Sequence, residues 1–293
     1  MGRFSNSLAM AKASWRVLLA DKELLVFPLL GFLATVLVLG VFGALAWITV
    51  DQTTVPATTA AASTTEYEPT ALTWVAGVLG YFAATFAGMF FLSALVAGAY
   101  QRFQGGDPSV GSALSGAAHR LPQILGWSLV VTTVGLIIQA IESRAGFVGV
   151  LIARGIGMAW QIVTWLAVPV IVVEGTGPFS SLKSAAGLFK KTWGENIIAQ
   201  VGFGVLGVVA AIPGLLVGGG LIWLGPAANV ILGVVLVVLW VAVVSLVISA
   251  LNGIYRTALY LYASTGQVPP AFPAQAMQNA FRPRGTGISS LFS

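Results

Sequence analysis

The stretch VVEGTGPFSSLKSAAGLFKKTWGE, residues 172–195, interrupts a chain that is otherwise almost entirely apolar. One apolar run ends just before Glu174, and another begins at Asn196. On a helical wheel of residues 178–193, the apolar and aromatic side chains fall on one half and the lysines and serines on the other. A helix with this pattern lies in the membrane interface and does not cross the bilayer. We therefore expect a surface helix over residues 178–193, with Pro178 in its first turn.

The composition predicts an integral membrane protein with several spans. Of the 293 residues, 57% are hydrophobic and 8% are charged, and the mean hydropathy is +0.93. A soluble domain has about 25% charged residues. The chain has no cysteine and one histidine, His119, which excludes disulfides, thiolate metal sites and any site that needs two imidazoles. We expect no cleavable signal peptide, because the first apolar stretch is longer than such a signal.

Charge-free intervals mark six expected membrane spans. Four of these intervals exceed the roughly 18 apolar residues that are typical of a transmembrane helix. A fifth interval, from Asn196 to Tyr255, is long enough for two helices, and the glycines and proline of 218–226 supply the turn between them. The expected spans are residues 24–50, 71–100, 121–141, 155–173, 196–217 and 227–254.

The distribution of lysine and arginine predicts the orientation. When loops are assigned alternately to the two sides, 12 of the 14 basic residues fall on one side, and only Arg144 and Arg154 fall on the other. Since positive charge collects on the cytoplasmic side, we expect both termini to be cytoplasmic. We expect residues 51–68, which are rich in threonine and alanine, to form a flexible external loop, and residues 266–293 to form a partly disordered cytoplasmic tail.

Two further segments, residues 4–20 and 109–119, also place apolar side chains at helical spacing opposite polar ones. In the first of them the expected apolar stripe consists of Phe4, Leu8, Ala11, Trp15 and Leu18. Each of the three amphipathic segments precedes a pair of spans, which is typical of an internal repeat. The predicted fold over residues 1–265 is therefore an all-α, polytopic membrane protein. Its six transmembrane helices form three hairpins, each preceded by a cytoplasmic amphipathic interfacial helix.

Three stretches resemble a family of uncharacterised prokaryotic six-pass integral membrane proteins. They are SWRVLLADKELLVFPLL at residues 14–30, VPVIVVEGTGPFSSLKSAAGLFKKTWGENI at 168–197 and LNGIYRTALYLYASTGQVPPAF at 251–272. This resemblance covers most of the chain and implies the same architecture and a place in the prokaryotic plasma membrane, but no activity. The order of Pro169, Glu174, Pro178, Lys183 and Trp193 is also remotely similar to the membrane domain attached to some glycerophosphodiester phosphodiesterases.

Few side chains in or near the spans can carry a function. Glu174 could bind a cation or relay a proton, but its place at the end of a span favours a structural role in capping or anchoring the surface helix. Arg154 is an interfacial charge if the fourth span begins after it, and otherwise a buried cation whose nearest candidate partner is Glu142. Asn252 could line a polar path, and a hydrogen bond between helices is the favoured role.

Membrane lipids with anionic head groups are the expected partners. The basic side chains on the amphipathic segments each gain about 1 kcal/mol near an anionic leaflet. They are Lys12, Arg16, Lys183, Lys190 and Lys191. We expect no nucleic-acid partner, no cofactor, no metal and no catalytic residue. The sequence leaves protein partners and the oligomeric state open.

Three functions fit these observations. The favoured one is a non-enzymatic scaffold or membrane- and envelope-organising factor, because the sequence offers no catalytic constellation. The alternative is a transporter or channel for a lipid-like or hydrophobic substrate, since transporters also use internal repeats and glycine-broken helices. A membrane enzyme that acts on lipid ranks last, because the spans contain no paired acids and the chain has no cysteine.

Overall fold

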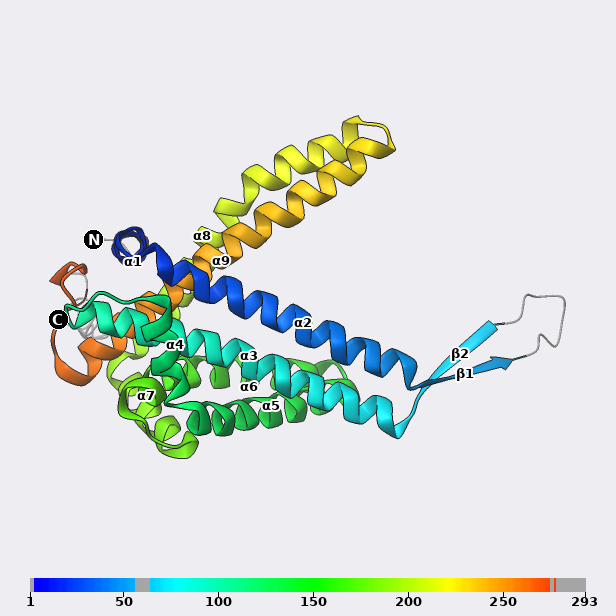
Figure 1. Ribbon diagram of the computed structural model, residues 1–293, viewed down its shortest axis with the longest axis horizontal. Coiled ribbons are helices and arrows are strands. Elements are labelled where there is room, and N and C mark those ends of the chain that lie inside the picture. Colours follow the sequence, from blue (N-terminus) through cyan, green and yellow to red (C-terminus); the bar gives the residue numbers. More distant parts are fainter. Residues whose placement is uncertain (1–2, 56–63, 275–276, 278–293) are drawn as a thin grey trace, which may run out of the picture.

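A computed structural model describes residues 3–55, 64–274 and 277 of the chain (Figure 1). The elements in this part are α1 (Arg3–Ala20), the 3-10 helix η1 (Lys22–Leu25), α2 (Val26–Ile48), β1 (Val50–Val55), β2 (Thr64–Pro69), α3 (Ala71–Phe103), α4 (Val110–Ala118), α5 (Leu121–Arg144), α6 (Phe147–Thr164), α7 (Ala167–Glu174), α8 (Pro178–Leu224) and α9 (Ala227–Thr265). This part of the protein is therefore helical apart from one two-stranded hairpin.

Six helical stretches in the described residues are long and apolar enough to cross a bilayer, which confirms the predicted number. They are Lys22–Ile48, Ala71–Phe103, Leu121–Arg144, Gly149–Glu174, Phe203–Trp223 and Asn229–Thr265. Many of their large apolar side chains point away from the protein: Leu37 is 69% exposed, Leu216 71% and Trp223 86%. Apolar surface of this extent is typical of contact with lipid.

The helix α3 is at the centre of the bundle. It packs along α2 and also contacts α4, α5, α7 and α9, while α8 and α9 pack along each other. The pair α8 and α9 diverges from α2 and α3 toward its tip (Figure 1). The helices α1, α4 and α7 gather at one end of the bundle, here called the α1–α4 end, and the strands lie at the opposite end, the β end (Figure 1). The most buried side chains, among them Leu24, Phe27, Leu95 and Tyr255, come together near the α1–α4 end.

The prediction of a flexible loop over residues 51–68 is wrong at both ends of that segment. The strands β1 and β2 pair in antiparallel register from Val50 opposite Pro69 to Val55 opposite Thr64. Threonine, valine and tyrosine prefer extended backbone, which explains the pairing. The base of the hairpin is closed by the Thr70 hydroxyl, which donates to the Thr49 carbonyl at 2.7 Å. Residues 56–63 lie outside the described part.

The surface helix expected over residues 178–193 is not a separate element. The helix α8 begins with Pro178 in its first turn, as expected, but it continues without a break to Leu224 and so includes the fifth span. The two residues between the expected helices, Gly194 and Glu195, include no proline, and a single glycine costs only about 1 kcal/mol in a helix. The sequence therefore lacks a signal strong enough to stop the helix.

The tail expected over residues 266–293 packs onto the bundle at its start. Phe272 is buried, and its ring meets that of Phe103 edge to face with centroids 5.9 Å apart. Met277 is also buried. The ring contact with Phe103 and the burial of Met277 in the apolar core explain why the start of this polar segment docks on the bundle. Residues 275–276 and 278–293 lie outside the described part.

The helix α1 packs on α8 and α9 with a face that only partly matches the expected stripe. Ala11 and Leu18 of the stripe are buried together with Ala13, Ser14 and Val17, whereas Leu8 is 57% exposed and Trp15 42% exposed. Small side chains let two helices approach closely, which explains why the Ala13–Ser14 side faces the bundle. The exposed side of α1 joins Leu8, Trp15 and Leu19 to the neighbouring Lys12 and Arg16 in one strip.

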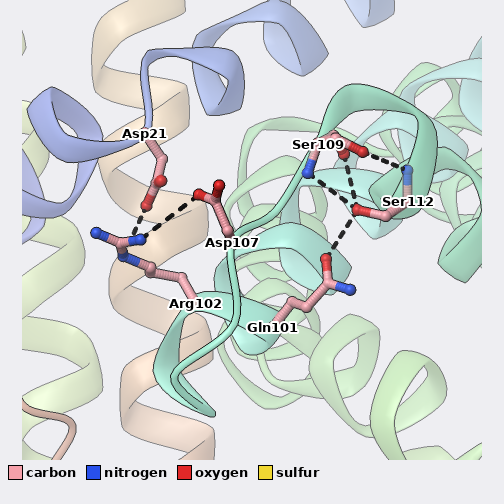
Figure 2. A network of polar contacts seen from close by, with 6 residues as sticks. All are labelled: Asp21, Gln101, Arg102, Asp107, Ser109 and Ser112. Carbon is pink, nitrogen blue, oxygen red and sulfur yellow. Dashed lines mark hydrogen bonds and ion pairs between the residues drawn. The ribbon is translucent and has the colours of Figure 1, made fainter.

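A polar network at the α1–α4 end ties the start of the first span to the end of the second (Figure 2). The buried Asp21 carboxylate lies 3.0 Å from Arg102 Nε, and Asp107 lies 3.8 Å from the same guanidinium. The Ser112 hydroxyl at the start of α4 donates to Gln101 Oε1 at 2.8 Å. Burial raises the pKa of Asp21, and the attraction of Arg102 only partly opposes this rise. The cost of burying Asp21 offsets much of its attraction to Arg102. The Asp21–Arg102 pair therefore fixes the relative position of the two span ends more than it adds stability.

Glycines allow the close contact between α8 and α9. A Cβ atom at Gly214 would meet the Trp240 side chain, and one at Gly218 would meet Val237 and the carbonyl of Gly233. The Trp240 indole N–H donates to the Ala210 carbonyl across this contact at 2.9 Å. Small residues and hydrogen bonds are the usual means of joining helices in a membrane, where hydrophobic association is weak.

Replacing Gly218 by leucine should therefore separate α8 from α9. The clash with Val237 should lower the stability by about 1–3 kcal/mol, measured as a lower midpoint of thermal unfolding in detergent. The matched control is Gly219→Leu, because a Cβ atom at Gly219 has open space around it. An equal loss of stability in both variants would contradict this packing.

Candidate functional site: a cavity at the broken fourth span

Pro169 breaks the fourth span at Trp165. A proline has no N–H to donate to the carbonyl four residues earlier, here that of Trp165, and its ring crowds that carbonyl. Accordingly, α6 ends at Thr164 and α7 begins at Ala167. The indole of Trp165 reaches α9 at this break, where its Nε1–H donates to Asn252 Oδ1 at 3.1 Å.

A cavity of about 1050 Å³ adjoins the break. Its walls come from α3, α5, α6, α7, α8 and α9. Most of the lining is apolar or aromatic and includes Met89, Leu92, Trp127, Val131, Ile138, Met158 and Trp160. Trp127 and Trp160 stack with ring centroids 6.1 Å apart. Along α5 the lining extends from Trp127 to Glu142, which corresponds to about 22 Å at the rise of an α-helix. The cavity is therefore long, and most of it suits an apolar guest.

Trp165, Asn252 and Arg256 form a polar group at one end of this cavity, and Glu142 lies at the other end of the α5 wall. Asn252 and Arg256 are one helical turn apart on α9, and Arg256 Nη2 donates to Asn252 Oδ1 at 3.4 Å. The guanidinium carbon lies 5.2 Å from the centroid of the Trp165 ring, a cation–π contact. Behind Trp165, Tyr255 packs at 5.8 Å between ring centroids. Trp165 thus orients both polar side chains of α9.

The cavity brings together two of the polar residues that the sequence singled out, Arg154 and Asn252, and also Glu142. Asn252 makes the hydrogen bond between helices that was its favoured role. The fourth span begins at Gly149, before Arg154, yet the ion pair with Glu142 does not form: no carboxylate of the described residues lies within 4.0 Å of Arg154. Arg154 is exposed in the second turn of the span, from which its long side chain can reach the membrane surface.

Glu174 lies outside the cavity and does not cap the surface helix, whose N-cap is Gly177 without a side-chain hydrogen bond. Glu174 instead accepts a hydrogen bond from the Tyr260 hydroxyl at 3.0 Å, which joins the end of α7 to α9. The next residue, Gly175, has φ +66°, and a Cβ atom there would meet the Arg120 guanidinium. The chain turns sharply after Glu174, and this turn aims the carboxylate at α9 instead of α8.

The basic residues expected to meet lipid head groups are exposed where the structure describes them. Lys12 and Arg16 lie on the outer strip of α1, and Lys183 lies in the second turn of α8. The helix α1 lies at the α1–α4 end of the bundle (Figure 1), and the first turns of α8, which carry Lys183, follow α7 at the same end. The side chains of Lys190 and Lys191 lie outside the described part.

Sequence reasoning missed Arg256 and Trp165 as site residues. Arg256 was counted only as a topological charge at the end of the sixth span. Its place four residues after Asn252 put both on one face of α9, which is the signal that could have paired them. The second signal was the position of Trp165, four residues before Pro169. Because Pro169 has no N–H, the carbonyl of Trp165 loses its helical partner, which predicts a break in the helix at Trp165.

The fold and the cavity define a multi-pass helical membrane protein with a ligand-sized cavity among its helices. The chain belongs to a family described as a family of unknown function (DUF6159), whose model matches residues 72–269, two-thirds of the chain. No curated protein and no solved structure matches the chain. These comparisons give no support to the remote likeness to the membrane domain of glycerophosphodiester phosphodiesterases.

The contact between Tyr260 and Glu174 should stabilise the fold. A double-mutant cycle with Tyr260→Phe and Glu174→Ala should give a coupling of about 0.5–1.5 kcal/mol, because Glu174 is exposed and water competes for its carboxylate. Thermal or denaturant unfolding in detergent measures it. Glu174→Gln keeps an acceptor and should lose less stability than Glu174→Ala. Independent, additive losses would show that the two residues do not interact.

Proposed function

We propose that the protein binds a lipid-like amphiphile in its central cavity and transports it within the membrane. Of the two functions that the sequence favoured, this is the transporter alternative. The observation that carries the proposal is the long, largely apolar cavity that has the Trp165–Asn252–Arg256 group beside the break in the fourth span. Discontinuous spans surround the substrate sites of many transporters, because an unwound turn presents side chains and backbone groups to a ligand.

The dimensions of the cavity fit this class of ligand. A volume of about 1050 Å³ is at the upper end of the range of small-molecule sites, about 300–1000 Å³. The wall along α5 extends about 22 Å, most of the roughly 30 Å of hydrocarbon in a bilayer. An extended acyl chain can lie along such a wall beside Val131, Ile138 and Met158. A compact polar solute would leave most of that apolar lining facing water.

A scaffold does not require this cavity. A protein that only organises its neighbours gains stability by filling its interior, because cavities lose packing contacts. Here α8 and α9 meet through glycines at Gly214 and Gly218, so the chain can pack closely where it needs to. The open space beside Trp165 is therefore better explained by a ligand than by loose packing.

We further propose that the α1–α4 end faces the cytoplasm of a prokaryotic cell and rests on the plasma membrane through amphipathic surfaces. The support is the exposed strip of α1, in which Leu8, Trp15 and Leu19 can enter the interface while Lys12 and Arg16 meet anionic head groups. Lys183 adds a third exposed cation at the same end. This orientation is supported by the distribution of lysine and arginine. The proposed repeat of three hairpins is supported by the order of the elements along the chain.

Filling the cavity should displace the ligand. Gly157 lines the cavity, and a Cβ atom there would make only ordinary contact with Ile138, at 3.8 Å. Gly157→Trp should therefore fold but occupy the space that the amphiphile needs. We expect the wild-type protein to retain one phospholipid per chain in native mass spectrometry after extensive delipidation in detergent, and Gly157→Trp to retain none.

The control for this experiment is Gly43→Trp. Gly43 lies on α2 and does not line the cavity, and a Cβ atom there would have no neighbouring atom within 4 Å. This variant should retain the lipid as the wild type does. Equal retention in Gly157→Trp and the wild type, or no retained lipid in the wild type, would contradict the proposed function.

A further inference from the structure

We propose that the ligand carries an anionic head group, a phosphate or a carboxylate, and that Arg256 binds it at the polar end of the cavity. This inference rests on the proposed function and adds the chemical class of the ligand. It follows from the state of the Arg256 side chain, from the free hydrogen-bonding capacity of Asn252 and from the absence of a nearby acid among the described residues.

The Arg256 guanidinium has too few partners for its charge. Its Nε atom is buried without a hydrogen-bond acceptor, and the hydrogen bond that it makes to Asn252 is long, at 3.4 Å. A guanidinium has five N–H donors, so most of its capacity is unused within the described part of the chain. Among the described residues no carboxylate lies within 4.0 Å of it. A charge away from water is unfavourable unless it is paired, and an anionic ligand would pair it.

Asn252 completes the site as a second donor. Both of its neighbours, the Trp165 indole and the Arg256 guanidinium, are donors, so the amide oxygen must face them. The amide nitrogen has no acceptor among the described residues and can donate to the ligand. The Trp165 ring holds the guanidinium in place by the cation–π contact at 5.2 Å. A fixed guanidinium beside an amide N–H suits the paired oxygens of a phosphate or a carboxylate.

The rest of the cavity decides between an amphiphile and a free anion. The acid that shares the lining, Glu142, lies at the far end of the α5 wall, about 22 Å from the level of Trp127. Most of the remaining lining, including Leu92, Val131 and Met158, is apolar and offers nothing to an inorganic ion. The second cation of the lining, Arg154, is 11 residues before Trp165, about 16 Å away along the helix. The geometry therefore places the head group at Arg256 and the apolar chain along α5 and α6.

The test compares two lipids with identical acyl chains, phosphatidylglycerol, which is anionic, and phosphatidylcholine, which is zwitterionic. Delipidated protein is offered equal amounts of both, and the bound lipid is identified by native mass spectrometry. The wild type should prefer the anionic lipid by about tenfold to hundredfold, as expected for a hydrogen-bonded ion pair. Arg256→Gln should still bind one lipid but show less than about a twofold preference. Arg144→Gln, which removes an exposed arginine outside the cavity, should behave as the wild type.

Arg256→Lys is a second test that does not depend on whether Arg256→Gln folds, because lysine keeps the positive charge. It should retain a reduced preference for the anionic lipid, since lysine lacks the planar fork of arginine. An unchanged preference in Arg256→Gln, or loss of all preference in Arg256→Lys, would overturn the role of Arg256 while leaving lipid binding in place. Loss of all lipid in the wild type would instead contradict the proposed function.

Competition with inorganic phosphate distinguishes a lipid head group from a free anion as the ligand of Arg256. Because the apolar chain supplies much of the binding of an amphiphile, millimolar phosphate should not displace phosphatidylglycerol from the wild type. Complete displacement by phosphate, without competition from phosphatidylcholine, would show that the site takes a free anion and would overturn the head-group assignment.

Discussion

The hydrogen bond between Trp165 and Asn252 joins the broken fourth span to the last span, and the candidate site depends on it. Pro169 removes one backbone hydrogen bond and ends α6, which in a bilayer is tolerated only where other protein groups replace the lost contacts. The indole of Trp165 does not restore that backbone bond, but it ties the break to α9 by donating to Asn252 and by packing near Tyr255. The same ring lies against the guanidinium of Arg256, so one side chain links the break in the helix to the cation of the site.

Close packing and open space are distributed unevenly over the bundle. Toward their tip, α8 and α9 approach through Gly214, Gly218 and Gly233, where larger side chains would clash. At the α1–α4 end, the buried core and the Asp21–Arg102 pair fix the ends of the spans. The cavity has walls from α3, α5, α6, α7, α8 and α9. Its lining contains none of these three glycines and neither residue of the Asp21–Arg102 pair, so the open space is separate from both contacts.

The sequence predicted the features that depend on hydropathy. The six spans follow from charge-free intervals, because the bilayer excludes charge from long apolar helices. Features that depend on which surfaces meet could not be predicted in this way. The face of α1 toward the bundle is set by the small residues Ala13 and Ser14, and a hydropathy stripe ranks them below Leu8 and Trp15. The β hairpin forms because its residues prefer extended backbone, and α8 continues past Gly194 and Glu195 because no proline stops it there. Composition and hydropathy do not report these local preferences.

The residues of the candidate site, too, could be predicted only in part from the sequence. Arg154 and Asn252 stood out as polar residues within apolar sequence, and the fold places both on the cavity. Arg256 did not stand out, because a positive charge at the end of a span is expected from topology. Its importance appears only once the break at Pro169 brings Trp165 beneath it. Glu174, the most conspicuous acid in the sequence, is engaged by Tyr260 and lies away from the cavity.

The most direct test of a lipid-binding cavity at the broken fourth span is an experimental map of the protein in a lipid nanodisc. We predict elongated density along α5 and α6, with its head within hydrogen-bond distance of Arg256 and Asn252. A cavity that is closed by side chains, or that holds only separate water molecules while lipid density is confined to the outer surface, would contradict this prediction.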